Sequence, residues 1–148
     1  MHKKMTIGRV ELVDFPVAKI FAVPAKIDTG AYRSSIWATN IREKNGRLTF
    51  CLLGPRSEYY SGKELSTKLY QLVDVENSFG HKEERYSVFL KVKIDGRVFK
   101  SNFTLANRAR KTYPALIGRK LLKDRFIVDV SLGQPLDDEQ VNGDDSLE

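Results

Sequence analysis

Turn signals that separate short apolar stretches are the strongest constraint on how this chain folds. Asn45-Gly46 and Asp95-Gly96 are typical of two-residue β-hairpin turns, because both central residues of such a turn need a positive φ. Alternating apolar and polar residues flank each pair, as expected for strands with one buried face. Many short strands joined by tight turns predict an all-β fold, either a small β-barrel or a sandwich.

The same patterns predict the order of the elements. Strands are expected over 6–13, 20–28, 35–41, 47–53, 69–75, 86–94, 98–105, 115–117 and 126–130, with one short helix over 118–123. Residues 54–63 and 106–112 are polar, and we expect them to be loops. We therefore predict one mostly-β domain over residues 1–136.

Composition narrows the class of protein. The 148 residues suffice for one domain with its own core, and no apolar run approaches the ~18 residues that span a bilayer. The single cysteine, Cys51, cannot form an internal disulfide, which favours a reducing compartment. We expect a cytoplasmic protein that does not engage a membrane.

The charge is distributed unevenly along the chain. Residues 137–148 carry six acids and no Lys or Arg, and we expect them to form a disordered tail. The preceding 136 residues carry all 25 Lys and Arg against 13 acids, a net charge of +12. A basic body favours an anionic partner, although a merely solvated basic face would have the same composition. No nucleic-acid-binding motif accompanies the charge, so nucleic acid is the least favoured partner.

One acidic motif follows an apolar strand. Asp28-Thr29-Gly30 comes directly after the predicted strand, where the glycine permits a sharp turn and the threonine hydroxyl can fix it. In acid–base peptide hydrolysis two carboxylates share a proton while one of them activates a water. Because the chain has one Asp-Thr-Gly, such a site would need a second copy and hence a twofold homodimer. The motif could also be a simple turn that ends a strand.

Five motifs occur in order along the chain: Ile7-Gly8-Arg9-Val10-Glu11, residues 26–31 with Ser34-Ser35, residues 78–85, residues 105–108 and Leu116-Ile117-Gly118-Arg119. Together they resemble one bacterial family with a retropepsin-like fold, labelled ATP-dependent zinc protease and linked to RimK-type glutamate ligases. The resemblance implies a retropepsin-like β-barrel and a homodimeric aspartic-type peptidase (a hydrolase). It further implies cleavage of peptide or isopeptide bonds in acidic or glutamylated proteins, and a functional link to a RimK-type ligase.

The resemblance also implies roles for particular residues. Asp28 is the expected catalytic acid–base, with Thr29 and Gly30 in its loop, and Ile117, Gly118 and Arg119 would support that loop. Residues 78–85 resemble a flap that closes over substrate, although they could equally be a solvated hairpin end. The expected substrate-binding residues are Ala31, Arg33, Ser78, Gly80, His81, Glu83, Arg85 and Arg108.

The zinc in that family label finds little support in the residues. A catalytic zinc normally takes three protein ligands, but the chain has two histidines, His2 and His81, one cysteine and no His-Glu-x-x-His motif. We therefore expect no metal and no other cofactor, and the absence of a P-loop argues against ATP use. The main alternative is a non-catalytic module on the same fold, which binds an acidic protein through its basic face.

Overall fold

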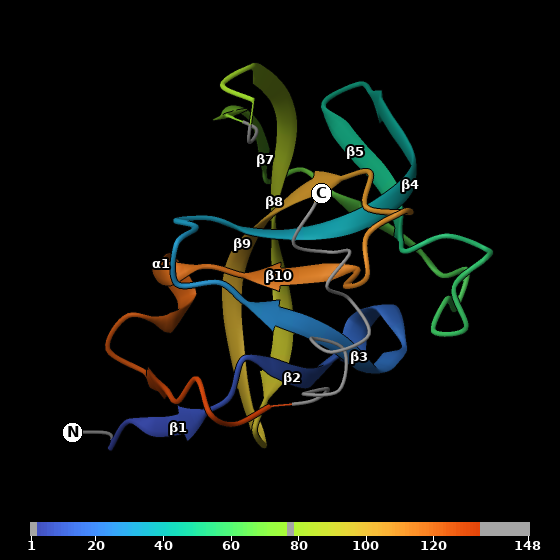
Figure 1. Ribbon diagram of the computed structural model, residues 1–148. Helices are drawn as coiled ribbons and strands as arrows, with labels where there is room; N and C mark the ends of the chain where they lie inside the picture. The colour runs from blue at the N-terminus through green and yellow to red at the C-terminus, as the bar shows by residue number, and fades with distance from the viewer. Residues whose placement is uncertain (1–2, 77–78, 134–148) are drawn as a thin grey trace.

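The computed structural model describes residues 3–76 and 79–133, which form a mostly-β fold with one short α-helix (Figure 1). The strands are β1 (Met5–Ile7), β2 (Val10–Phe15), β3 (Ile20–Ile27), β4 (Ser34–Lys44), β5 (Arg47–Leu52), β6 (Glu64–Thr67), β7 (Tyr70–Glu76), β8 (Lys82–Ile94), β9 (Arg97–Ala106), β10 (Ala115–Ile117) and β11 (Phe126–Val128). The helices are a 3-10 turn, η1 (Pro16–Ala18), and α1 (Arg119–Leu122). The predicted all-β class with one short helix is confirmed.

Both predicted tight turns are present. Asn45 and Gly46 have φ values of 54° and 73° and join β4 to β5, while Asp95 and Gly96 have φ values of 49° and 81° and join β8 to β9. Two consecutive positive φ values match the twist of a two-residue hairpin. The local sequence therefore fixes the register next to both turns, and the β4–β5 register shifts only further away, between Thr39 and Arg42.

Strand β10 ties distant parts of the chain together. It pairs in parallel with β3 and antiparallel with β4, so the pairings run in a ring from β10 through β3, β2, β8, β9 and β4 back to β10. Strands β5 and β6 extend this sheet beyond β4, β7 pairs with β8, and β1 and β11 form a separate parallel pair. Consequently the loop that joins β3 to β4 is held beside the end of β10 (Figure 1).

The core lies between the strands of this ring. Phe15 and Phe103 are fully buried and meet edge to face with ring centroids 5.5 Å apart. Ile36, Val88 and Ile117 are equally buried, so β4, β8 and β10 each contribute one face to the core. Each such buried side chain contributes about 1.5–3 kcal/mol to the stability of the fold. The loop at the end of β3 is therefore attached to a rigid core.

Two sequence predictions differ from the structure. The single strand expected over 6–13 is wrong, because β1 and β2 belong to different sheets and Gly8 separates them. A Cβ on Gly8 would lie 2.5 Å from the Gly133 backbone nitrogen, so the chain bends where two backbones meet. The sequence also predicts no strand where β6 runs along β5.

Some predictions concern residues that the structure does not describe. The expected tail 137–148 and Ser78 both lie outside the described residues. Within residues 3–76 and 79–133, no helix is long and apolar enough to cross a membrane.

Candidate functional site

Asp28 lies at the tip of β3, where the backbone turns toward β4. Its N–H donates to the Ile117 carbonyl at 2.8 Å, which continues the β3–β10 pairing by one residue. Its Oδ1 accepts from the Gly30 N–H at 3.0 Å, and its carbonyl accepts from the Ala31 N–H at 3.2 Å. The half-buried carboxylate is therefore oriented by the backbone of its own loop.

Gly118 packs directly behind this loop. A Cβ at this position would lie 2.5 Å from the Arg33 carbonyl oxygen and 2.9 Å from the Ala31 carbonyl oxygen. Both are backbone atoms, which cannot move as a flexible side chain can. The Gly118 N–H donates to the buried Ser34 Oγ at 3.0 Å, so the loop is held at close range from behind.

Arg119 holds the same loop from its exposed side. Its backbone N–H donates to the Ala31 carbonyl at 2.7 Å. One guanidinium nitrogen donates to the Gly30 carbonyl at 2.9 Å and to the Thr29 carbonyl at 3.2 Å. The guanidinium also lies 5.9 Å from the centre of the Tyr32 ring, within cation–π range. The predicted Ile-Gly-Arg segment and the Asp-Thr-Gly loop therefore lie in contact.

Arg108 interacts electrostatically with Asp28 and with a second arginine, Arg85. Arg108 follows β9, is half-buried, and donates from Nε to the Tyr113 carbonyl at 3.1 Å. Burial lowers the pKa of Arg108, the charge of Arg85 lowers it further, and the Asp28 carboxylate partly offsets both effects. Arg85 pairs with Glu83 at 3.2 Å. Arginine remains protonated at neutral pH, so Arg108 brings a positive charge to Asp28, and Arg85 adds to the positive charge around Arg108.

A row of side chains crosses five strands and begins two residues before Asp28. Each residue is directly opposite the next in the order Lys26 (β3), Leu116 (β10), Ser35 (β4), Thr104 (β9) and Ser87 (β8). Directly opposed residues share one face of a sheet, and the three hydroxyl residues are buried. This row was not found from sequence, because its members come together only through long-range register.

The remaining predicted site residues divide between the loop and the β7–β8 hairpin. Ala31 and Arg33 are half-buried in the loop, and Arg33 lies 6.0 Å from the Tyr32 ring centre. Gly80, His81 and Glu83 are exposed near the hairpin tip, which projects from the sheet in Figure 1. Sequence reasoning assigned no role to Tyr32, or to Ser34 although it belongs to one of the motifs, because their roles depend on contacts with residues 118–119.

An open, largely apolar cavity of about 580 Å³ lies beside the Asp28 loop. It is lined by Thr29, Tyr32, Arg119, Lys120, Leu122, Lys123, Phe126 and Val128. Apolar residues surrounding an exposed hollow next to a candidate site are typical of an interaction surface. In the described part of the chain, no group of three or more His, Cys, Asp or Glu side chains could hold a metal ion.

An Asp-Thr-Gly loop at a strand tip, held by an Ile-Gly-Arg segment that crosses behind it, places the fold in the retropepsin-like class. The chain belongs to the RimB-like family, described as "Retropepsin-like aspartic endopeptidase RimB", whose sequence model matches residues 6–136.

Similar proteins extend this comparison. Curated relatives from Shewanella halifaxensis (31% identical, covering 90% of this chain and 31% of the relative) and Desulfotalea psychrophila (30% identical, covering 87% and 29%) are each named "Probable alpha-L-glutamate ligase". The chain therefore spans about a third of the length of these relatives. A crystal structure of a Legionella pneumophila protein of unknown function is 28% identical with a TM-score of 0.65, covering 88% of this chain and 96% of that one.

Proposed function

We propose that the chain is an aspartic-type peptidase that hydrolyses peptide or isopeptide bonds. The active site would lie between two copies of the chain, each of which supplies one Asp28 carboxylate. The observation that carries this proposal is the half-buried Asp28 carboxylate, held by the Gly30 N–H in a loop that Gly118 and Arg119 fix. Two facing carboxylates share one proton, because both cannot ionise cheaply at short range. The ionised one takes a proton from the attacking water, and the protonated one donates to the substrate carbonyl oxygen.

Features beside the loop support the second copy. The cavity lined by Thr29, Tyr32 and Arg119 adjoins the site, and nearby Ile127 and Val130 are 54% and 73% exposed. Within the described residues, β1 and β11 pair only with each other, so each has an open edge. A twofold axis beside Thr29 would cover this apolar surface and bring the two Asp28 loops face to face.

Arginines near the carboxylate support an acidic substrate. Arg85 and Arg108 act electrostatically on each other, and Arg108 also on Asp28, so a bound carboxylate would relieve the repulsion between the two cations. The relatives named as glutamate ligases point the same way, because a ligase of that name attaches the residue that such a peptidase would remove. We therefore propose glutamate-rich or glutamylated proteins as substrates, a functional link to a RimK-type ligase, and a cytoplasmic location.

Mass-spectrometric digestion of α- and γ-linked oligoglutamate peptides, from acidic to neutral pH, tests this function. Wild type and Asp28→Asn are compared with and without a chelator, and oligoglutamine serves as the uncharged control. We expect cleavage of one glutamate linkage by wild type in either condition and none by Asp28→Asn. Cleavage by Asp28→Asn, or cleavage that the chelator abolishes, would contradict the proposal.

The alternative function is a non-catalytic module that binds an acidic protein. It is favoured by one observation: a single copy supplies only one carboxylate of the dyad, whereas Arg108 and Arg85, the latter paired with Glu83, are both present in one copy. This alternative predicts saturable binding of oligoglutamate that Asp28→Asn leaves intact, with no product at any pH. Fluorescence anisotropy with labelled peptide, run beside the digestion, separates the two functions.

A further inference from the structure

The hydrogen-bond ladder of β8 is interrupted along one side. β7 pairs with β8 as far as Val88, and β2 pairs with it only at Lys93 and Ile94. Residues 89–92 therefore have a partner strand, β9, on one side and none on the other among the described residues. Because alternate residues of a strand direct their N–H and C=O groups to opposite sides, two of these four present unpaired backbone groups to the gap.

A second open edge faces the same gap. β6 pairs with β5 along its whole length, and its other edge has no partner strand among the described residues. Leu65, Ser66 and Thr67 of β6 line a groove together with Phe89, Leu90 and Lys91 of β8. The groove is therefore bounded by two strand edges.

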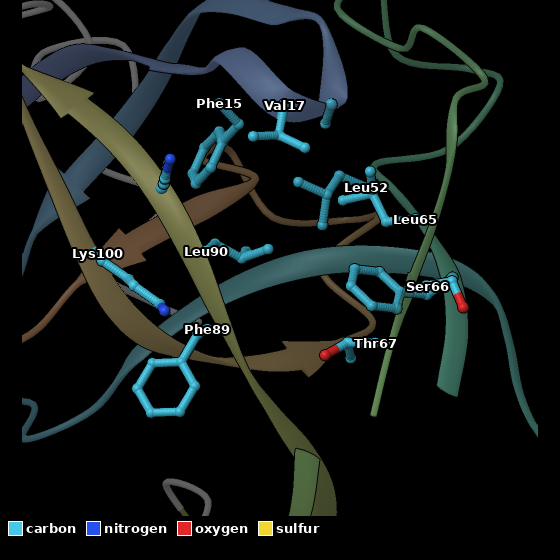
Figure 2. Close-up of a pocket in the computed structure, with 12 residues that line it drawn as sticks. Phe15, Val17, Leu52, Leu65, Ser66, Thr67, Phe89, Leu90 and Lys100 are labelled. Atoms are coloured by element: carbon cyan, nitrogen blue, oxygen red, sulfur yellow. The ribbon is translucent and has the colours of Figure 1, made fainter. Parts of the chain in front are cut away.

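The floor of this groove is apolar. Phe15, Phe50, Leu52 and Leu90 are almost fully buried beneath it, and Val17 of η1, 52% exposed, closes one end. Figure 2 shows Phe15, Val17, Leu52, Leu65 and Leu90 gathered around one space, and each of them comes from a different element. The cavity measures about 240 Å³, below the roughly 300–1,000 Å³ typical of small-molecule sites. It is better matched to one or two side chains of a longer ligand.

The outer rim of the groove is cationic. Lys91 and Lys100 are directly opposite each other on β8 and β9, an arrangement in which like charges destabilise each other. The Lys100 ammonium lies 5.5 Å from the ring centre of the exposed Phe89. No described carboxylate forms an ion pair with either lysine. A carboxylate placed here would therefore relieve an existing repulsion.

We propose that this groove binds an extended peptide segment in which apolar and acidic residues alternate. The segment pairs its backbone with residues 89–92 of β8, as in β-strand addition. Because side chains alternate between the two faces of a strand, every second residue enters the apolar floor over Phe15 and Leu90. The residues between them lie on the outer face, where their carboxylates meet Lys91 and Lys100. This surface is separate from Asp28 and does not depend on the proposed peptidase activity.

Fluorescence anisotropy with the full chain tests the predicted alternation. The probe is a labelled Leu-Glu-Val-Glu-Leu-Glu peptide, and the control is Leu-Leu-Val-Glu-Glu-Glu, which has the same composition in blocks. We expect the alternating peptide to bind at least about tenfold more tightly. N-methylation of every second backbone nitrogen, at either the odd or the even positions of the peptide, should remove this advantage for one of these two sets, because only one set faces β8. Equal affinities for the alternating and blocked peptides would overturn the proposal.

Matched variants locate the binding. Lys91→Glu combined with Lys100→Glu replaces one like-charge pair by another and should weaken binding about tenfold. Lys93→Glu, on the same face of β8 but where β2 pairs with it, should change affinity less than about twofold, as should Arg108→Gln near Asp28. Equal weakening by Lys93→Glu would indicate a non-specific charge effect, and strong weakening by Arg108→Gln would assign the peptide to the Asp28 site. Either result would overturn the proposal.

Hydrogen exchange gives an independent readout of backbone pairing. Addition of the alternating peptide should slow exchange of amides within residues 89–92, and the blocked peptide should not. Protection confined to residues 28–33 would contradict the assignment. Full protection of 89–92 in the protein alone would mean that the edge is already covered, which would equally refute a separate partner.

Discussion

Ser34 and Ser35 are adjacent and both buried, at 2% and 6% exposure, but the structure predicts opposite responses to substitution. Ser34 Oγ accepts the Gly118 N–H at 3.0 Å, directly behind the Asp28 loop. Ser35 Oγ has no hydrogen-bond partner among the described residues. Ser34→Ala would therefore leave a buried N–H unsatisfied, whereas Ser35→Ala would remove a hydroxyl that already lacks a partner.

The expected magnitudes follow from these environments. An unsatisfied buried backbone donor costs about 1–3 kcal/mol, so Ser34→Ala should lower the free energy of unfolding by that amount. A change of 1 kcal/mol shifts Tm by about 2–4 °C in a chain of this length, which predicts a loss of about 2–12 °C. Ser35→Ala should be neutral or stabilising, because burial of an unpaired hydroxyl is itself unfavourable.

Urea unfolding followed by fluorescence measures both effects. The single tryptophan, Trp37, lies on β4 beside these serines, and its backbone N–H donates to the carbonyl of Pro114, which directly precedes β10. Its emission therefore follows unfolding of this part of the sheet. Wild type and the two alanine variants should have equal m values, because each unfolds the same surface. Equal stabilities, or a larger loss for Ser35→Ala, would refute the assignment of Ser34 as the support of the loop.

Three further predictions concern the loop, the arginine near it and the turn that follows β11. Gly118→Ala should lower the free energy of unfolding in urea by about 1–3 kcal/mol, because the new Cβ would meet backbone atoms at 2.5 Å. Gly30→Ala, whose Cβ would have one contact at 3.3 Å, should cost far less. Equal losses would count against tight packing behind the loop. Arg108→Gln should lower kcat/KM for an oligoglutamate substrate about tenfold or more and make kcat/KM less dependent on salt, since a hydrogen bond to a charged group contributes about 1.5–3 kcal/mol. An unchanged kcat/KM would exclude Arg108 from substrate binding. Hydrogen bonds from the Ser131 hydroxyl and, to a smaller extent, from the Ser131 backbone N–H lower the pKa of Asp129. The Asp129 carboxylate therefore stabilises the fold at pH values above its unfolded pKa of about 3.9, and this contribution is lost as the pH falls through the lower folded pKa. An NMR titration of Asp129 in Ser131→Ala should show a raised midpoint, and an unchanged midpoint would contradict the hydroxyl contribution.

Local features of the fold were predictable from sequence. The turns at Asn45-Gly46 and Asp95-Gly96 depend on the conformational freedom of two residues, so they are present where the pattern predicts. β10 was also predicted, because three consecutive apolar residues, Ala115-Leu116-Ile117, precede Gly118. In contrast, the break at Gly8 depends on close contact with Gly133, 125 residues away, which no local pattern reveals.

The candidate site was predictable to the same extent. Asp28 and Arg119 belong to short motifs, and their segments do lie in contact. The different environments of Ser34 and Ser35, and the row from Lys26 to Ser87, depend on the register of five strands. The groove beside β8 could not be predicted either, because it results from where β7 stops pairing and β2 begins.

The most direct test of the central claim is an activity measurement on mixed dimers. Wild type is co-refolded with a ninefold excess of Asp28→Asn, and oligoglutamate cleavage is measured per wild-type chain. If each site needs Asp28 from two copies, about nine in ten wild-type chains pair with an inactive partner, and activity per wild-type chain should fall to about one tenth. Activity per wild-type chain that is unchanged by the excess of variant would mean that one copy holds the whole site, and would contradict the shared dyad.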